Sequence, residues 1–371
     1  MRRVISIITI FAFCLSVYSQ SSVSKQNTKA GAVSTAKKTV VKTSAKQVAS
    51  SQKTTKTNVK KATKAAEKKA DTNVEAAVSN VVSAAGAYNC GYLCNPPLPY
   101  LPAKLDILFI GNSFAIDTST ALPEILNCLG MSNVNVYVLY KGGCSMKEHY
   151  NYYKSGEKVY ELYQYNIRGE TKLETATSIN NVMSRFPYDV VIFQQYSLES
   201  GDYTTYEPYL SKIIQAYNIN KISPRTTFAF NMTWAYSSKH KNITKYKTPL
   251  NMYKKICESV KRMKAASGID VIIPGGTAVQ NARSIGSLIT DNEFTRDNQH
   301  IDYYMGRYLL ACTFFESIIA PCTGRNLRDD YTIYGKNGTS NQVNNSNRRT
   351  LQNCARLAVA NNFEVSEFID E

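Results

Sequence analysis

Five short apolar runs, each bounded by turn residues, recur along the chain after residue 104. They are LDILFIG (105–111), VNVYVLY (134–140), YDVVIFQQ (188–195), TTFAFNMTW (226–234) and IDVIIPGG (269–276). Continuous runs of this length are typical of strands that are buried on both faces. Segments with helical periodicity lie between and after them, at 121–130, 206–217, 248–266 and 302–319. Alternating strands and helices predict right-handed βαβ crossovers and a parallel sheet between two helix layers.

The N-terminal part of the chain has a different pattern. Arg2 and Arg3 precede an apolar run from Val4 to Val17, which is the pattern of a cleaved signal peptide. Residues 21–86 are mostly Lys, Ala, Ser, Thr and Val, with no aromatic residue. Such a segment cannot bury enough apolar area to offset its ordering entropy, so we predict a disordered linker there.

The predicted organisation therefore has three parts. They are a signal peptide at 1–20, a linker at 21–86 and a folded domain at 87–371, with its core at 104–320 and a C-terminal extension at 324–371. Within the extension, residues 349–360 are helix-like and are expected to dock on the outside of the domain. A signal peptide implies a secreted or periplasmic protein, and no later stretch is long enough for a transmembrane anchor.

The net charge of +16 is concentrated in the N-terminal part, because residues 1–86 carry +12 and the remaining 285 residues only +4. A folded nucleic-acid-binding protein would carry its basic face within the domain, so we expect no nucleic-acid partner. The basic linker could instead make electrostatic contact with anionic surfaces. The alternative is an ordinary solvated linker, as most charged runs are.

The nine cysteines include Cys14 within the predicted signal peptide, which leaves eight in the mature chain. An even number in an exported protein permits disulfides without requiring them, and Cys90 and Cys94 are the pair best placed for one. Cys128 and Cys312 lie in apolar helical patterns and are predicted to be buried free thiols. No Cys or His spacing fits a zinc site, and we expect no metal and no cofactor.

The carboxyl ends of the strands are where a parallel sheet forms its ligand site. Ser113 follows the first run, so its hydroxyl can lie at the open edge of the sheet and its N–H can face a developing oxyanion. An ordinary serine in a strand-to-helix turn is the alternative. Residues 118–120 are possible helix caps after it. Gly143, after the second run, permits close approach of its backbone N–H to a ligand or serves a tight turn.

The third and fourth runs end in amides and aromatic residues. Gln194 and Gln195 could donate to an oxyanion or cap the next segment. Trp234 could stack on a sugar ring or fill the core. The aromatic side chains near the strand ends that could contact a substrate are Phe114, Tyr196, Trp234, Tyr236 and Tyr303.

Asp297 and His300 form the most informative pair, because a spacing of three brings the carboxylate beside the imidazole. The carboxylate can then fix the ring tautomer. Of the two other histidines, His240 lies in a polar, basic stretch and is expected at the surface. His149 could line the pocket, but a helix would direct its neighbour Glu148 elsewhere.

The motifs GNSF, GGCSMKEH, QQYS, WAY and DNQHIDYYMGRYL occur in the order of the conserved blocks of SGNH (GDSL-type) hydrolases, and the chain resembles this superfamily over residues 104–320. Within this superfamily, the sequences of these motifs are most similar to a largely uncharacterised branch of secreted bacterial proteins. The resemblance implies a flavodoxin-like three-layer α/β/α sandwich with a five-stranded parallel sheet, and two-step ester hydrolysis without a metal.

The resemblance also implies site roles. Ser113 would be the nucleophile, His300 the general base and later acid, and Asp297 the residue that orients His300. The N–H groups of Ser113 and Gly143 would form the oxyanion hole with a side-chain amide. The chain departs from the family where Asn112 replaces a common Asp, and where QQYS replaces Gly-x-Asn-Asp. Gln195 is the preferred substitute for the oxyanion asparagine and Gln194 the second choice.

These inferences predict a secreted serine esterase that hydrolyses acyl esters, chiefly acetyl, on carbohydrate or another small substrate. The alternative is a catalytically silent carbohydrate-binding module of the same fold, held at a surface by its cationic linker. A lipase would need an apolar lid segment, and the sequence shows no obvious one.

Overall fold

A single mixed sheet organises the part of the chain that the structure describes. The computed structural model describes residues 97–98, 101–220, 225–288, 292–336 and 339–366. The strand order is β4-β3-β2-β1-β5-β6-β7. The predicted signal peptide, the linker, Cys90 and Cys94 lie outside the described residues.

Five strands that are adjacent in the sheet, in the order β2-β1-β5-β6-β7, are parallel and correspond to the five apolar runs. They are β1 (Leu105–Gly111), β2 (Val134–Tyr140), β5 (Val190–Phe193), β6 (Thr227–Asn231) and β7 (Val271–Ile273). Nearly all of their residues are buried. Continuous apolar sequence suits them because helices cover both faces of the sheet.

An antiparallel hairpin extends this sheet at the β2 edge, and the sequence patterns did not predict it. It consists of β3 (Tyr160–Asn166) and β4 (Gly169–Thr177), with β3 paired to β2. Its residues are largely polar, and only Tyr160, Leu162 and Tyr165 of β3 and Thr177 of β4 are buried, so no continuous apolar run marks it. The predicted five parallel strands are therefore confirmed, within a sheet of seven.

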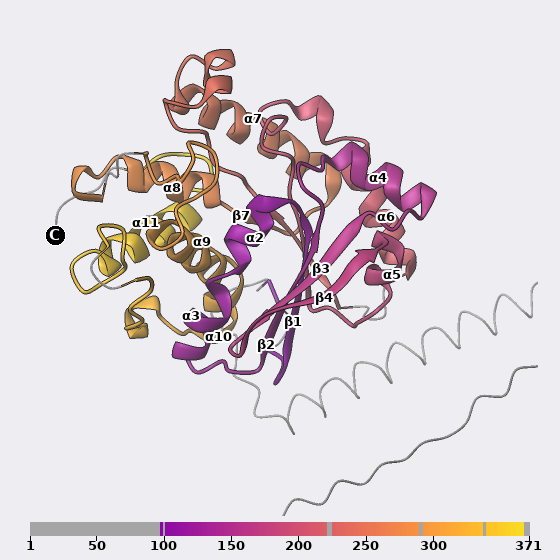
Figure 1. The fold of residues 1–371 in the computed structure, drawn as a ribbon, viewed down its shortest axis with the longest axis horizontal. Coiled ribbons are helices and arrows are strands. Elements are labelled where there is room, and N and C mark those ends of the chain that lie inside the picture. Colours follow the sequence, from indigo (N-terminus) through magenta and orange to yellow (C-terminus); the bar gives the residue numbers. More distant parts are fainter. Residues whose placement is uncertain (1–96, 99–100, 221–224, 289–291, 337–338, 367–371) are drawn as a thin grey trace, which may run out of the picture. The chain divides into compact units, whose positions relative to one another are not determined.

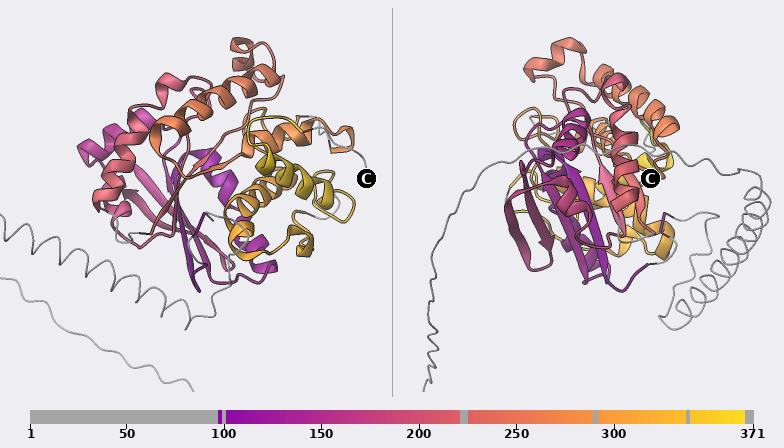
Figure 2. Two further views of the ribbon diagram at one scale, coloured as in Figure 1. Left: turned by 180° about the vertical axis from the view of Figure 1, so that it is seen from behind. Right: turned by 90° about the vertical axis from the view of Figure 1, so that its right-hand side faces the viewer.

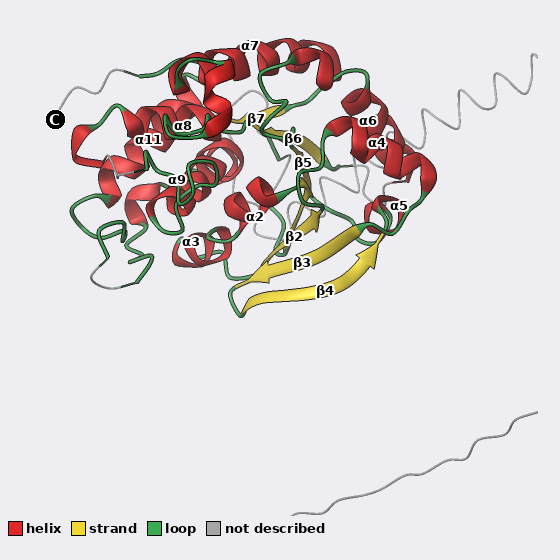
Figure 3. Ribbon diagram, turned by 45° about the horizontal axis from the view of Figure 1, so that its top comes forward, coloured by secondary structure: helices red, strands yellow, loops and turns green. Residues whose placement is uncertain are grey.

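Helices cover both faces of the sheet (Figures 1 and 2). On one side lie α4 (Met146–Ser155), α5 (Ile179–Met183), α6 (Tyr209–Asn220) and α7 (Pro249–Ser267). On the other lie α2 (Ser113–Ser119), α3 (Leu122–Cys128), α8 (Gly275–Arg283), α9 (Met305–Phe314), α10 (Ala320–Thr323) and α11 (Arg348–Ala360). The predicted three-layer α/β/α class is confirmed, and Figure 3 shows the sheet between its helices.

The C-terminal extension packs on the second helix layer, as predicted. Helix α11 contacts both α8 and α9. The buried Tyr308 hydroxyl donates to Asp330 Oδ2 at 2.5 Å and accepts from Gln352 Nε2 at 2.9 Å. This polar chain ties α9, the loop after α10 and α11 together, so the extension has a defined position on the domain.

All six cysteines in the described residues are free thiols. Cys312 is buried, as predicted, but the prediction of burial was wrong for Cys128. Cys128 is the last residue of the short helix α3, where its side chain faces solvent. Among the described residues, none of the helices combines the length and hydrophobicity that a membrane span needs.

Helix α8 begins inside the run that was predicted as a strand up to residue 276. Strand β7 ends at Ile273, and α8 starts at Gly275. A Cβ at Gly276 would lie 2.3 Å from the backbone oxygen of Thr233, so the start of α8 can approach the segment after β6 only because residue 276 has no side chain.

We expect Gly276→Ala to lower the free energy of unfolding by roughly 1–3 kcal/mol, because the added methyl must displace backbone atoms in a packed interior. Gly286→Ala is the matched control, since a Cβ there meets nothing within 4 Å. Urea denaturation of both variants beside the native chain measures the difference. Equal stability of the two variants would contradict this close approach.

Candidate active site

Ser113 stands at the carboxyl end of β1 and is the first residue of α2. Asn112 caps this helix, and its Oδ1 accepts a hydrogen bond from Phe114 N at 3.1 Å. The first N–H groups of a helix have no acceptor within the helix, so the N–H of Ser113 is available to a ligand. The predicted caps at 118–120 were wrong, because Thr118 and Thr120 donate their hydroxyls to carbonyls four residues earlier.

The hydroxyl of Ser113 meets His300, which is 187 residues away in the sequence. Ser113 Oγ lies 2.8 Å from His300 Nε2. On the other side of the ring, His300 Nδ1 lies 2.6 Å from Asp297 Oδ2. The three side chains thus form a continuous hydrogen-bonded chain with the order and spacing of a nucleophile, a base and an orienting acid.

Asp297 is held ionised by the groups around it. Its Oδ1 accepts hydrogen bonds from the backbone N–H of His300 at 2.7 Å and of Gln299 at 3.1 Å. Partial burial acts to raise the pKa of Asp297, but the hydrogen bonds from the His300 ring and from these two N–H groups outweigh it and lower the pKa. The carboxylate is therefore negatively charged at neutral pH.

Contacts with the segment after β6 fix the loop that carries Asp297 and His300. Trp234 Nε1 donates to the backbone oxygen of Gln299 at 2.9 Å, and Ser237 Oγ donates to Asn298 Oδ1 at 2.9 Å. Asn298 has a φ of 68°, a left-handed conformation that asparagine tolerates better than most residues. The loop is thus anchored on both sides of the turn.

A buried ion-pair network connects this loop to the helix that carries the nucleophile. Asp117, on α2, is fully buried, and both of its oxygens lie 2.9 Å from Arg296 Nη1. Arg307, on α9, donates to Asp117 Oδ1 from Nη2 at 2.8 Å and from Nε at 3.0 Å. Burial raises the pKa of Asp117, while attraction to Arg307 and Arg296 acts in the opposite direction.

Sequence reasoning missed this network, because its members are 179 and 190 residues apart. The adjacency of Arg296 to Asp297 was the one local signal. Since Asp117 is on the same short helix as Ser113, its bond to Arg296 sets the position of the base relative to the nucleophile.

Three of the predicted substrate-contacting aromatics are buried. Trp234 is 0% exposed, and Phe114 and Tyr236 are each 1% exposed, so none of them can stack on a sugar ring. Trp234 packs face to face on Phe114 with ring centroids 4.1 Å apart, and Phe114 lies 5.6 Å from the His300 ring. Of the two interpretations of Trp234, the structure therefore favours the core residue. It supports Phe114 and, through it, the imidazole.

The predicted oxyanion-hole amides have other partners. Gln195 is fully buried, and its Nε2 donates to the backbone oxygen of Thr205 at 2.8 Å and to the hydroxyl at 3.0 Å. Gln194 Nε2 donates to Asn112 Oδ1 at 2.7 Å. Gln195 is thus not placed to donate into the site, and Gln194 acts on it indirectly, by orienting the cap of α2.

A pocket of about 480 Å³ opens at Ser113. Its lining residues are Asn112, Ser113, Phe114, Tyr140, Gly143, Tyr196, Ser197, Arg296, Asp297, Gln299 and His300. Gly143 has a φ of 63°, so the tight turn after β2 requires glycine, and the ring of Tyr196 lies beside it. The site is therefore open to a small ligand and carries both polar and aromatic groups.

The remaining histidines lie outside this pocket. His149 is fully buried, contrary to the suggestion that it lines the pocket, and its Nδ1 lies 2.9 Å from the Tyr160 hydroxyl. Burial lowers the pKa of His149 to about 3, so it is neutral. His240 is partly exposed and caps η2 (Lys241–Lys245). Within the described ranges, we find no group of three or more His, Cys, Asp or Glu side chains arranged to hold a metal ion.

Comparison with known proteins gives a family match and several similar structures. The family described as "Domain of unknown function (DUF4886)" matches residues 106–344. A solved DUF4886 family protein from Bacteroides uniformis is 27% identical with a TM-score of 0.63, over 71% of this chain and 98% of that one. No curated protein matches the sequence.

More distant similar structures include a protein from Slackia heliotrinireducens that is described as a proposed SGNH hydrolase. It is 18% identical with a TM-score of 0.41, over 58% of this chain and 98% of that one. An acetyl xylan esterase is 12% identical with a TM-score of 0.37, over 57% and 98% of the two chains.

We expect Asp117→Asn to lower the free energy of unfolding by about 3 kcal/mol, because it leaves two partly buried guanidinium groups without their counter-charge. Glu258→Gln is the control, since its pair with Lys255 is exposed and should contribute less than about 1 kcal/mol. Chemical denaturation measures both. If both substitutions lower the free energy of unfolding by less than about 1 kcal/mol, the ion-pair network does not hold the loop.

Proposed function

Since this chain belongs to the DUF4886 family, whose description gives no function, we propose its activity from the site itself: it is a serine esterase of the SGNH kind that hydrolyses acyl esters. The observation that carries this proposal is the hydrogen-bonded chain from Ser113 through His300 to Asp297 in an open pocket. Its three members come from the carboxyl end of β1 and from the loop before α9. The motif order along the sequence supports the same activity.

The geometry is suited to acyl transfer in two steps. Ser113 Oγ attacks the carbonyl carbon of the ester while His300 Nε2 takes the hydroxyl proton. Collapse of the tetrahedral intermediate breaks the bond to the alcohol oxygen, which receives that proton from His300. Water then attacks the acyl-serine with His300 again as base, and the acid is released as Ser113 regains its proton. Asp297 stabilises the imidazolium that forms in each step.

The negative charge on the carbonyl oxygen needs donors that are already in place. We propose the backbone N–H groups of Ser113 and Gly143 as these donors. The first belongs to the free N-terminal turn of α2, and the second belongs to the glycine turn that lines the same pocket. Gln194 contributes by fixing Asn112, and thereby the direction of the Ser113 N–H.

We further propose that the substrate is an acetylated or similarly short-chain ester of a carbohydrate, met outside the cell. Tyr140 and Tyr196 line the pocket, and both are partly exposed. Tyr303 is 49% exposed, and the guanidinium of Arg296, a lining residue, lies 4.5 Å from its ring centre. Aromatic faces of this kind suit sugar rings. The predicted signal peptide supports export.

We expect Ser113→Ala and His300→Ala each to lower kcat for p-nitrophenyl acetate and acetylated xylan by about 10³-fold or more, because each removes a member of one catalytic unit. Ser155→Ala, at the exposed end of α4, should leave the rate unchanged. Steady-state hydrolysis of both substrates is the measurement. A fluorophosphonate probe should label the native protein at Ser113 and should fail to label His300→Ala.

The labelling separates lack of a suitable substrate from lack of activity. If Ser113 is not labelled and all variants hydrolyse esters alike, the esterase proposal is overturned. Retained binding of polysaccharide in that case would favour the catalytically silent binding module.

Asp297→Asn should lower kcat by roughly 10²- to 10⁴-fold with KM nearly unchanged, because the amide can no longer hold the tautomer or stabilise the imidazolium. The substitution is close in shape, and half of the Asp297 side chain is exposed, so stability should change little. Kinetics of the purified variant, with thermal unfolding as the folding control, checks this. A rate within twofold of the native protein would exclude Asp297 as the orienting acid.

A further inference from the structure

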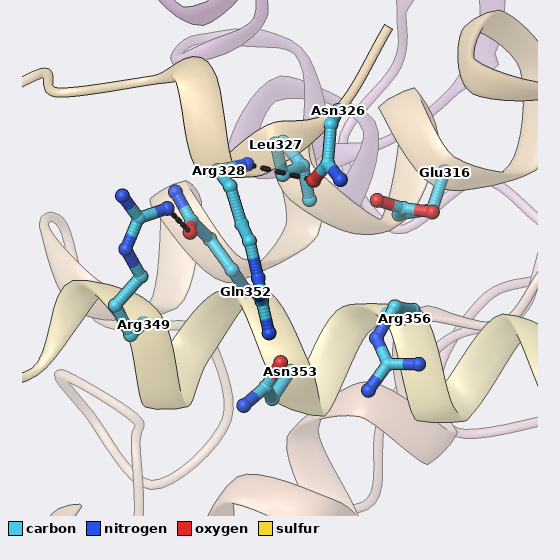
Figure 4. Close-up of a pocket in the computed structure, with 8 residues that line it drawn as sticks. All are labelled: Glu316, Asn326, Leu327, Arg328, Arg349, Gln352, Asn353 and Arg356. Atoms are coloured by element: carbon cyan, nitrogen blue, oxygen red, sulfur yellow. Dashed lines mark hydrogen bonds between the residues drawn. The ribbon is translucent and has the colours of Figure 1, made fainter. Parts of the chain in front are cut away.

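A second pocket lies away from Ser113, in the C-terminal part of the domain (Figure 4). Its volume is about 540 Å³, which is within the usual range for a small-molecule site. The lining residues are Glu316, Asn326, Leu327, Arg328, Arg349, Gln352, Asn353 and Arg356. None of them belongs to the pocket at Ser113, so this is a separate site.

Three arginines are brought to this pocket by two elements. Arg349, Asn353 and Arg356 have spacings of four and three on α11, which puts them on one face of the helix. Arg328 comes from η5 (Leu327–Asp329) and extends across the pocket toward Asn353 (Figure 4). All three arginine residues are exposed to solvent.

These arginines differ from Arg296 and Arg307, which share the carboxylate of Asp117. In the described part of the chain, no carboxylate lies within ion-pair distance of Arg328, Arg349 or Arg356. Arg349 Nη1 instead donates to the amide oxygen of Gln352 at 2.9 Å. Glu316 is the one carboxylate among the lining residues, so the three arginines together carry more positive charge than it can balance, and an anionic ligand would lower the repulsion between them.

The walls of the pocket are fixed before any ligand binds. Gln352 is buried and donates to the Tyr308 hydroxyl at 2.9 Å, which holds the middle of the helix face. Leu327 is also buried, and Asn326 Oδ1 accepts from Arg328 N at 2.9 Å, which fixes the turn that presents Arg328. Preorganisation of this kind lowers the entropic cost of binding.

Glu316 gives the pocket an acceptor as well as donors. It lies on the segment Phe315–Ile319 that continues α9, and burial raises its pKa while Arg356 acts to lower it. A carboxylate in the wall would repel a bare anion, but it can accept hydrogen bonds from hydroxyl groups. The side-chain amides of Asn326 and Asn353 can accept and donate in the same way.

We propose that this pocket binds an anionic saccharide, that is, a sugar carrying a carboxylate or phosphate group. The anionic group lies among Arg328, Arg349 and Arg356, and the ring hydroxyls contact Glu316, Asn326 and Asn353. The assignment is independent of the esterase activity, since it uses none of the residues at Ser113.

The test is calorimetric titration of the full chain with digalacturonic acid and with glucose 6-phosphate, at about 0.15 M salt to screen the basic N-terminal segment. Maltose and inorganic phosphate are the matched neutral and sugar-free probes. We expect one or both anionic sugars to bind, and each neutral or sugar-free counterpart to bind about tenfold or more weakly. Whichever sugar binds identifies the anionic group.

The triple variant R328Q/R349Q/R356Q should weaken that binding by about tenfold or more, and Arg168→Gln, an exposed arginine in the turn between β3 and β4, should not. Arg328→Gln alone, on an exposed turn, gives a second measurement if the triple variant unfolds early. Hydrolysis of p-nitrophenyl acetate by the triple variant should equal that of the native chain. The proposal is overturned if neither sugar binds, if inorganic phosphate binds as tightly, or if the arginine variants bind like the native chain.

Discussion

The buried carboxylate of Asp117 is the group on which the arrangement of the site depends. It lies on the same short helix as Ser113 and binds the guanidinium groups of Arg296 and Arg307. Two elements that are far apart in sequence, the strand-helix turn of the serine and the loop of the histidine, are thereby joined by charge-assisted hydrogen bonds in a desolvated interior. An ion pair of this kind is costly to break, because removal of one partner leaves the other buried without its counter-charge.

Aromatic packing and side-chain hydrogen bonds also hold the residues next to Ser113 in place. Phe114 follows the serine directly and stacks on Trp234, whose indole N–H holds the backbone of Gln299 next to the histidine. Asn112 precedes the serine and is oriented by Gln194. Both neighbours of Ser113 are therefore held by contacts with other segments. These contacts position the proposed nucleophile at the open edge of the sheet.

Arginines serve two different purposes in this domain. Arg296 and Arg307 are largely buried, are neutralised by one carboxylate and act within the fold. The three arginines around α11 and η5 are exposed and gather at a preformed pocket, and among the described residues none of them forms an ion pair with a carboxylate. The first set stabilises the domain, and the second set forms the site that we propose for an anionic ligand.

The sequence by itself determined the five parallel strands, the helix at the C-terminal extension, and the residues Ser113, Asp297 and His300 as candidates. These features depend on local patterns: continuous apolar runs mark strands buried on both faces, and a spacing of three puts an acid beside an imidazole. Only the tertiary structure decided the rest. It shows that the polar β3-β4 hairpin extends the sheet and that Trp234 and Tyr236 are buried. It also shows that Gln195 donates its hydrogen bonds to Thr205 and that Asp117 binds two distant arginines. The direction of a side chain and the identity of its partner depend on contacts between segments that lie far apart in the sequence, and no local pattern encodes them.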